Sequence, residues 1–142
     1  MKSINEKIEQ LTEKFQEVKD WEDRYKMIIK MGKEMEPLTD DQKKDDLKVQ
    51  GCQSQVWLHA DYRDGRIYFH ADSDALIAKG IVAMLISVYS GSTPDEILTT
   101  KPDFLTELGV KEHLSMGRTN GLMSMIKQIS IYAMAFKAKE SM

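Results

Sequence analysis

The feature that most constrains the fold is an Asp64–Gly65 pair between two segments in which apolar and polar residues alternate. Residues 53–62 (QSQVWLHADY) and 66–71 (RIYFHA) show the period of two that is typical of half-buried strands, and Asp-Gly is a strong signal for a two-residue hairpin turn. With this turn, Arg63 faces Arg66 and one face of the hairpin is apolar. That predicted core face consists of Leu58, Ala60, Tyr62, Ile67, Phe69 and Ala71.

Two helical patterns precede the hairpin. Apolar residues recur at helical spacing from residue 4 to residue 18, and Ser3 with Glu6 forms a candidate capping box. A second amphipathic pattern begins at about Asp20, with Gly32 placed to end that helix. Residues 47–49 supply a short first strand, so we expect a small antiparallel sheet of about three strands.

The second half of the chain is predicted to be helical. Ser73 can cap a helix that contains the apolar stretch 75–89, and Thr93-Pro94-Asp95-Glu96 is a second helix start with proline at the first helical position. A short helix is expected at residues 104–108, and a long helix with an apolar stripe from near Ser115. The order of helices, hairpin and helices predicts an α+β fold in which several helices pack on the sheet.

Length and charge limit the function. The 142 residues suit one domain, spanning 1–142, and a net charge of −3 offers no broad basic field for a nucleic-acid backbone. The N-terminal 15 residues are charged throughout, without the apolar stretch of a secretory signal. The most apolar run, residues 80–89, is about half the length of a membrane span. We therefore expect a cytoplasmic protein with neither nucleic acid nor membrane as a partner.

Cys52 is the only cysteine, which excludes an internal disulfide, a CxxC redox pair and a structural zinc site built on several thiolates. It lies in a turn-like segment in which Gly51 frees the backbone just before the predicted strand, and a nucleophilic thiol needs such a reachable place. The competing interpretation is that a free cysteine acts as a small buried hydrophobe. A strand extended back to residue 52 would turn the thiol inward, on the side of Val56 and Leu58.

Charged side chains stand at two predicted helix starts. Asp72 and Asp74 bracket Ser73 and could serve as paired carboxylates, but capping and compensation of the helix dipole explain them more simply. Arg118 lies at the start of the last helix, where free N–H groups and the dipole favour an anion. If the fold brings Cys52 near Arg118, a thiolate or persulfide would be stabilised, whereas the alternative is an arginine in a solvated first turn.

The three histidines allow two further hypotheses. His59 and His70 face each other in the predicted register, and two facing imidazoles can hold a metal, but two solvent-side strand residues are the stronger interpretation. We therefore assign no metal site from the sequence. His113 could act as the base for Cys52 in a Cys–His hydrolase. No orienting side chain and no oxyanion loop is identified for that arrangement.

Several short motifs together resemble the SufE family of sulfur-acceptor proteins, which includes the CsdE type. The resemblance covers nearly the whole chain, through the order and spacing of Trp21–Tyr25 (WEDRY), Gly51–Leu58 (GCQSQVWL), Asp64–Arg66, Ala71–Ala75 (ADSDA), His113–Ser115, Arg118 and Asn120–Leu122. It implies an α+β fold like that of IscU-type iron–sulfur scaffolds. It also implies that the protein accepts sulfur from a cysteine desulfurase, stimulates that enzyme and relays the sulfur toward iron–sulfur cluster assembly.

The resemblance assigns roles to particular residues. Cys52 matches the persulfide acceptor, Arg118 contacts the thiolate, the persulfide or the partner, and the surface formed by Gly51, Gln53, Ser54 and Asp74 binds the partner. That partner is a SufS-like or CsdA-like desulfurase, whose pyridoxal phosphate is its own, so no cofactor is expected on this chain. A SufB-like scaffold or another sulfur acceptor would receive the sulfur.

The chain departs from the family pattern just before Arg118, and one alternative function stays open. After His113-Leu114-Ser115 this chain has Met116-Gly117, where the family usually has Pro-Ser, and a glycine in place of a fixed backbone loosens the setting of Arg118. The protein is expected to be an accessory of sulfur transfer rather than an enzyme. The alternative is a non-covalent regulator or interaction module in which Cys52 is structural.

Overall fold

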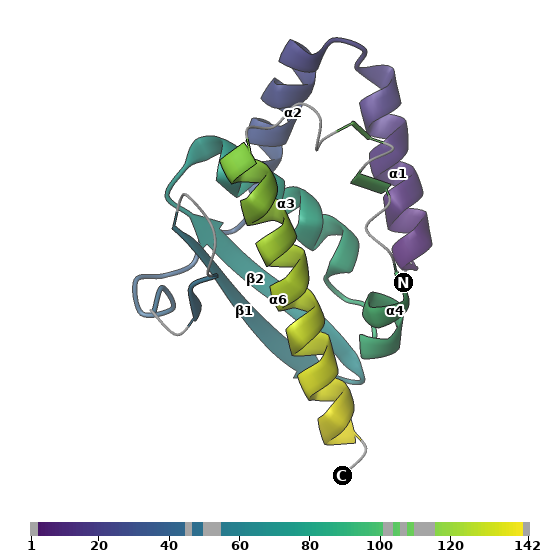
Figure 1. The fold of residues 1–142 in the computed structure, drawn as a ribbon, viewed down its shortest axis with the longest axis vertical. Helices are drawn as coiled ribbons and strands as arrows, with labels where there is room; N and C mark the ends of the chain where they lie inside the picture. The colour runs from purple at the N-terminus through teal and green to yellow at the C-terminus, as the bar shows by residue number, and fades with distance from the viewer. Residues whose placement is uncertain are drawn as a thin grey trace.

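The structure is a computed structural model, and it describes residues 3–44, 47–49, 55–100, 104–105, 108–109 and 116–140, with the side chains of 116–119 left aside. The elements follow one another as α1 (Ile4–Glu17), α2 (Trp21–Glu34), β1 (Val56–Arg63), β2 (Arg66–Ser73), α3 (Leu76–Tyr89), α4 (Pro94–Thr99) and α6 (Met116–Glu140). The predicted α+β class is confirmed. In Figure 1, α6 runs along the hairpin, while α1 and α2 lie on the far side of α3.

The hairpin has the predicted register. Strands β1 and β2 pair antiparallel, with Arg63 opposite Arg66 and His59 opposite His70. Asp64 and Gly65 both have positive φ, 53° and 79°, as a type I′ turn requires. All six residues of the predicted core face lie against the core, and four of them are almost fully buried: Leu58, Ile67, Phe69 and Ala71.

The expectation of about three strands was wrong, because the sheet has two strands in the described residues, β1 and β2. Residues 47–49 contribute only an isolated bridge between Lys48 and Trp57, with the N–H of Val49 donating to the carbonyl of Val56 over 2.8 Å. A segment this short forms a single β-bridge rather than a strand. It nevertheless lies beside β1, where the prediction put it.

Helices α3 and α6 cover the core face of the hairpin. The ring of Phe136 on α6 stacks on Tyr62 with centroids 5.1 Å apart, and the hydroxyl of Tyr132 donates to the carbonyl of Leu58 over 3.1 Å. Helix α3 packs on β2 and is buried along most of its length, as its apolar sequence predicts. No helix in the described ranges is long and apolar enough to cross a membrane.

Gly32 does not end the second helix, contrary to the prediction. Helix α2 continues to Glu34, and Gly32 lies where α2 crosses α3. A Cβ on Gly32 would be 2.7 Å from the backbone N of Gly80, and a Cβ on Gly80 would be 2.3 Å from the carbonyl O of Ile28. Both glycines are therefore required by the close approach of two backbones, which a local sequence pattern does not reveal.

The start of α3 also differs from the prediction. Ala75 is the N-cap residue, without a side-chain cap, whereas Ser73 lies at the end of β2. The Ser73 hydroxyl accepts a hydrogen bond from the N–H of Ala75 over 3.3 Å and donates one to the carbonyl of Gln55 over 2.8 Å. The serine thus joins the end of one strand to the beginning of the other.

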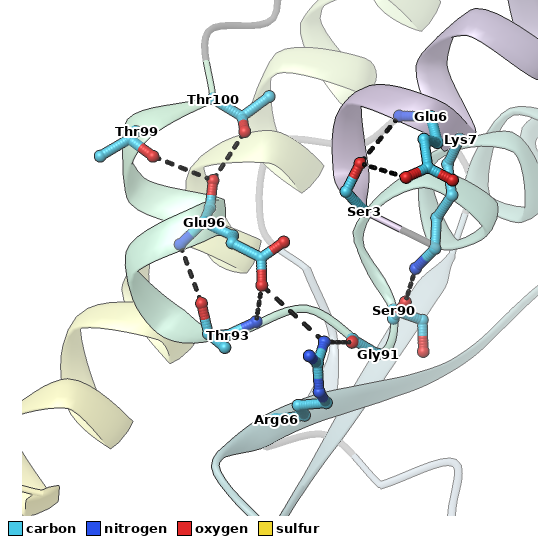
Figure 2. Close-up of polar contacts among 10 residues, drawn as sticks. All are labelled: Ser3, Glu6, Lys7, Arg66, Ser90, Gly91, Thr93, Glu96, Thr99 and Thr100. Carbon is cyan, nitrogen blue, oxygen red and sulfur yellow. Dashed lines mark hydrogen bonds and ion pairs between the residues drawn. The ribbon is translucent and has the colours of Figure 1, made fainter. Parts of the chain in front are cut away.

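A polar network ties α1 and α4 to the turn end of the hairpin (Figure 2). Thr93 and Glu96 form a complete capping box at the start of α4, as predicted. The guanidinium of Arg66 donates to the carbonyl of Gly91 over 2.8 Å and lies 3.8 Å from the Glu96 carboxylate. Burial lowers the pKa of Lys7, which donates to a backbone carbonyl in the same region, although nearby Glu96 opposes that shift.

Candidate functional site

The segment with the candidate thiol, residues 50–54, lies outside the described chain. Gly51, Cys52, Gln53 and Ser54 lie outside the described residues, and so does His113, so neither the burial of the thiol nor the Cys–His hypothesis is tested. Arg118 lies in the first turn of α6, which begins at Met116, close to the predicted start. The predicted proximity of Cys52 and Arg118 therefore stays a prediction. The residues on either side of 50–54 are described.

The entry to this segment is paired with the strand that follows it. The N–H of Val49 donates to the carbonyl of Val56 over 2.8 Å, and Lys48 forms a bridge with Trp57. The chain therefore leaves the edge of β1 after Val49 and returns to the same place at Gln55. Residues 50–54 join two ends that are held together by backbone hydrogen bonds.

The exit from the segment is held at Gln55. Its N–H donates to a carboxylate oxygen of Asp74 over 3.0 Å. Its carbonyl accepts from the N–H of Asp74 over 3.2 Å and from the Ser73 hydroxyl over 2.8 Å. Asp74, predicted as a partner-binding residue, is exposed and makes its described contacts with the residue that directly follows the candidate segment.

A buried carboxylate lies behind this exit. Asp72 is opposite Trp57 in the hairpin and is 2% exposed. One of its oxygens accepts from the N–H of Ser73 over 2.8 Å and lies 3.3 Å from the ammonium of Lys79. The other accepts from the N–H of Leu38 over 3.2 Å and lies 3.2 Å from the ammonium of Lys43. Asp72 therefore joins β2, α3 and the segment after α2.

The environment of Asp72 keeps it ionised. Burial by itself would raise its pKa, but the hydrogen bond from Ser73 and the ammonium groups of Lys43 and Lys79 outweigh burial, so its pKa lies below the ordinary value. The Lys43 ammonium also lies over the ring of Trp57, 5.4 Å from the centroid.

This cluster was missed by the sequence prediction, which treated Asp72 as a helix-capping residue. One signal could have indicated it. Lys79 is the only charged residue in the apolar stretch 75–89, and a charge among apolar neighbours on a buried helix needs a partner. Which carboxylate would meet it is decided by the packing of α3 on β2.

The two lysines near the exit of the segment are engaged by one carboxylate. The ammonium groups of Lys43 and Lys79 both lie within ion-pair distance of Asp72. The sequence candidate for a cation beside a thiolate or persulfide on residues 50–54 is Arg118.

Both the sequence and the fold resemble those of known proteins. Residues 9–133 match the family model described as SufE, Fe-S metabolism associated domain. An uncharacterized SufE-like protein of Synechocystis sp. is 39% identical over 131 residues, covering 92% of this chain and 82% of the relative. Another from Rhizobium meliloti is 39% identical over 127 residues, covering 86% and 91%.

Two further similarities extend the comparison. SufE-like protein 1, chloroplastic/mitochondrial, of Arabidopsis thaliana is 36% identical over 134 residues, which is 94% of this chain but 36% of that longer protein. The solution structure of a hypothetical protein from Thermus thermophilus superposes with a TM-score of 0.76 at 21% identity, covering 91% of this chain and 94% of that one. The likeness in structure is one of fold.

Proposed function

The chain belongs to the SufE family, whose domain is associated with Fe-S metabolism, and on this premise we propose that it is a sulfur carrier with Cys52 as the acceptor. The observation that carries the proposal is the family match over residues 9–133, in a chain that has one thiol only. The donor is a cysteine desulfurase of the SufS or CsdA class, and the recipient is a SufB-like scaffold or another sulfur acceptor. The protein acts in the cytoplasm as an accessory of the desulfurase.

The transfer needs one thiol on this chain. The Cys52 thiolate attacks the outer sulfur of a persulfide on the partner, the partner's S–S bond breaks, and a new S–S bond forms at Cys52. The partner's thiolate leaves with the electron pair and takes up a proton in place of the one that Cys52 lost. No outside oxidant or reductant is consumed. Removal of the sulfur frees the partner's thiol for its next turnover, which accounts for stimulation of the desulfurase.

The anchored ends of the segment 50–54 suit this role. Val49 is paired with Val56, and Gln55 is held by Asp74 and Ser73, so the base of the segment is fixed on the hairpin. A fixed base limits the orientations in which a docked partner meets Cys52, and a near-attack geometry raises the rate of transfer. Because Asp74 is exposed beside this base, it can also contact the partner together with Gly51, Gln53 and Ser54.

Arg118 supplies a cation for the thiolate or persulfide. The lysines near the exit of the segment, Lys43 and Lys79, are both paired with Asp72. A guanidinium in the first turn of α6 provides a counter-charge, or pairs with an anionic group of the partner. Pyridoxal phosphate remains with the desulfurase, and no cofactor is assigned to this chain.

The test is mass spectrometry of the intact protein after incubation with a SufS-class desulfurase and cysteine. Wild type should gain one or more sulfur atoms that are removed by a reducing agent, and Cys52→Ser should gain none. Absence of added sulfur on wild type, or equal labelling of Cys52→Ser, would contradict the proposal. Full stimulation of cysteine turnover by Cys52→Ala would instead favour a non-covalent regulator.

A further inference from the structure

A pair of imidazoles lies on the outer face of the hairpin, away from the core. His59 and His70 are directly opposite each other on β1 and β2, with ring centroids 6.0 Å apart. The Nε2 atom of His59 is 3.8 Å from one oxygen of Asp61, and that of His70 is 3.3 Å from the other. Both imidazoles therefore present the same nitrogen to one place on the surface.

That place opens into a pocket of about 340 Å³ between the hairpin and the segment that follows α2. Its walls are formed by Glu36, Pro37, Leu38, Thr39, Gln42, His59, Asp61 and His70. The lining includes two carboxylates and neither lysine nor arginine, so the pocket favours a cation. The side chains of His59, Asp61 and His70 are 35%, 45% and 44% exposed, which leaves them within reach of a solvated ion.

The two nitrogens of His59 differ in access. Its Nδ1 atom is buried and has no hydrogen-bond partner among the described residues. Its Nε2 atom is the one that approaches Asp61 and the pocket. The accessible nitrogen of His59 is thus the one that faces Asp61.

We propose that His59 and His70 bind a late divalent transition-metal ion, such as Ni²⁺, Zn²⁺ or Cu²⁺, through their Nε2 atoms. Neutral imidazole is a preferred ligand of these ions, and directly opposite positions on paired strands bring two such ligands close together. Asp61 neutralises part of the charge of the ion, and water from the pocket completes the coordination. The proposal does not rest on the role of Cys52.

The site is a weak chelate rather than a closed metal centre. Within the described ranges, no group of three or more histidine, cysteine, aspartate or glutamate side chains is arranged to hold a metal. Ligation through Nε2 also requires the ring proton to stay on Nδ1, and in His59 that atom has no described acceptor. We therefore expect an exchangeable ion.

The experiment is calorimetric titration of the full chain, without a histidine tag, with NiCl₂. A Cys52→Ser background removes the thiol as a competing ligand. One equivalent should bind. His59→Ala or His70→Ala should each weaken binding by at least about tenfold, because loss of even a residue that only hydrogen-bonds to a metal ligand lowers metal affinity by about that factor. His113→Ala is the matched control, which should bind as the background protein does.

A second readout keeps the test independent of how well the variants fold. In the Cys52→Ser protein, addition of Zn²⁺ should shift the Nε2 resonances of His59 and His70 in nitrogen NMR spectra and leave those of His113 in place. Absence of binding overturns the proposal. So does binding that survives removal of both His59 and His70, or a shift confined to His113.

Discussion

Replacement of Asp72 by asparagine should destabilise the protein strongly, although the side chain keeps its size. Each oxygen of Asp72 accepts one backbone N–H and faces one lysine, with Ser73 and Lys79 on one side and Leu38 and Lys43 on the other. An asparagine has one acceptor and one donor. Whichever way the amide is turned, its NH₂ group faces a backbone N–H and an ammonium group.

The magnitude follows from these contacts. A buried N–H that loses its acceptor costs about 1–3 kcal/mol. Breaking a buried ion pair costs about 3–5 kcal/mol, but Lys43 and Lys79 are 29% and 26% exposed and can turn partly to water, which lowers that contribution. We expect Asp72→Asn to lower the free energy of unfolding by about 3 kcal/mol, a large share of the roughly 5–15 kcal/mol of a typical domain.

The assay is urea unfolding followed by circular dichroism, with equal m values as the condition for comparing free energies. Asp74→Asn is the matched control, because that carboxylate is exposed and the amide oxygen can still accept from Gln55, so its cost should be about 0.5 kcal/mol or less. Combining Asp72→Asn with Lys79→Met should cost less than the sum of the two changes. A loss for Asp72→Asn within about 1 kcal/mol of that for Asp74→Asn would refute the reasoning.

The same contacts lead to three further expectations. The difference in unfolding free energy between wild type and Asp72→Asn should be largest above about pH 4, the ordinary pKa of an aspartate. It should shrink as pH falls through the lowered pKa of folded Asp72. A difference that is constant or grows in acid would contradict this. Gly80→Ala should lower the free energy of unfolding by at least about 1–3 kcal/mol in urea, because the added Cβ would lie 2.3 Å from the carbonyl oxygen of Ile28. An unchanged unfolding midpoint would be inconsistent with the close crossing of α2 and α3. Asp74→Ala should speed amide hydrogen exchange at Gln55 while global stability changes little, and unchanged exchange there would exclude the carboxylate as an anchor.

Local signals were sufficient for much of the fold. The Asp64–Gly65 turn predicted the register of the hairpin, and the alternation on either side predicted its core face. The capping box at Thr93 and Glu96 predicted the start of α4. These predictions depend on backbone dihedral preferences and on hydrogen bonds between residues close in the chain, so the rest of the structure does not alter them.

Two of the incorrect predictions concern residues whose partners are distant in the chain. Gly32 was expected to end a helix, but it lies at a helix crossing with Gly80. Ser73 was expected to cap α3, but its hydroxyl donates to the carbonyl of Gln55. In both cases the residue type suits two uses, and the choice between them is made by the tertiary contact.

The candidate site also combines features that the sequence determined with features that depend on tertiary contacts. The sequence by itself determined that one thiol, Cys52, must carry any sulfur chemistry, because a count of cysteines does not depend on folding. Only the tertiary structure decided that the segment 50–54 is anchored at both ends and that Asp72 is buried between Lys43 and Lys79. These contacts join different elements of the fold, and the free energy that selects them comes from burying the apolar faces of the helices on the hairpin. Each buried charge must then find its partner.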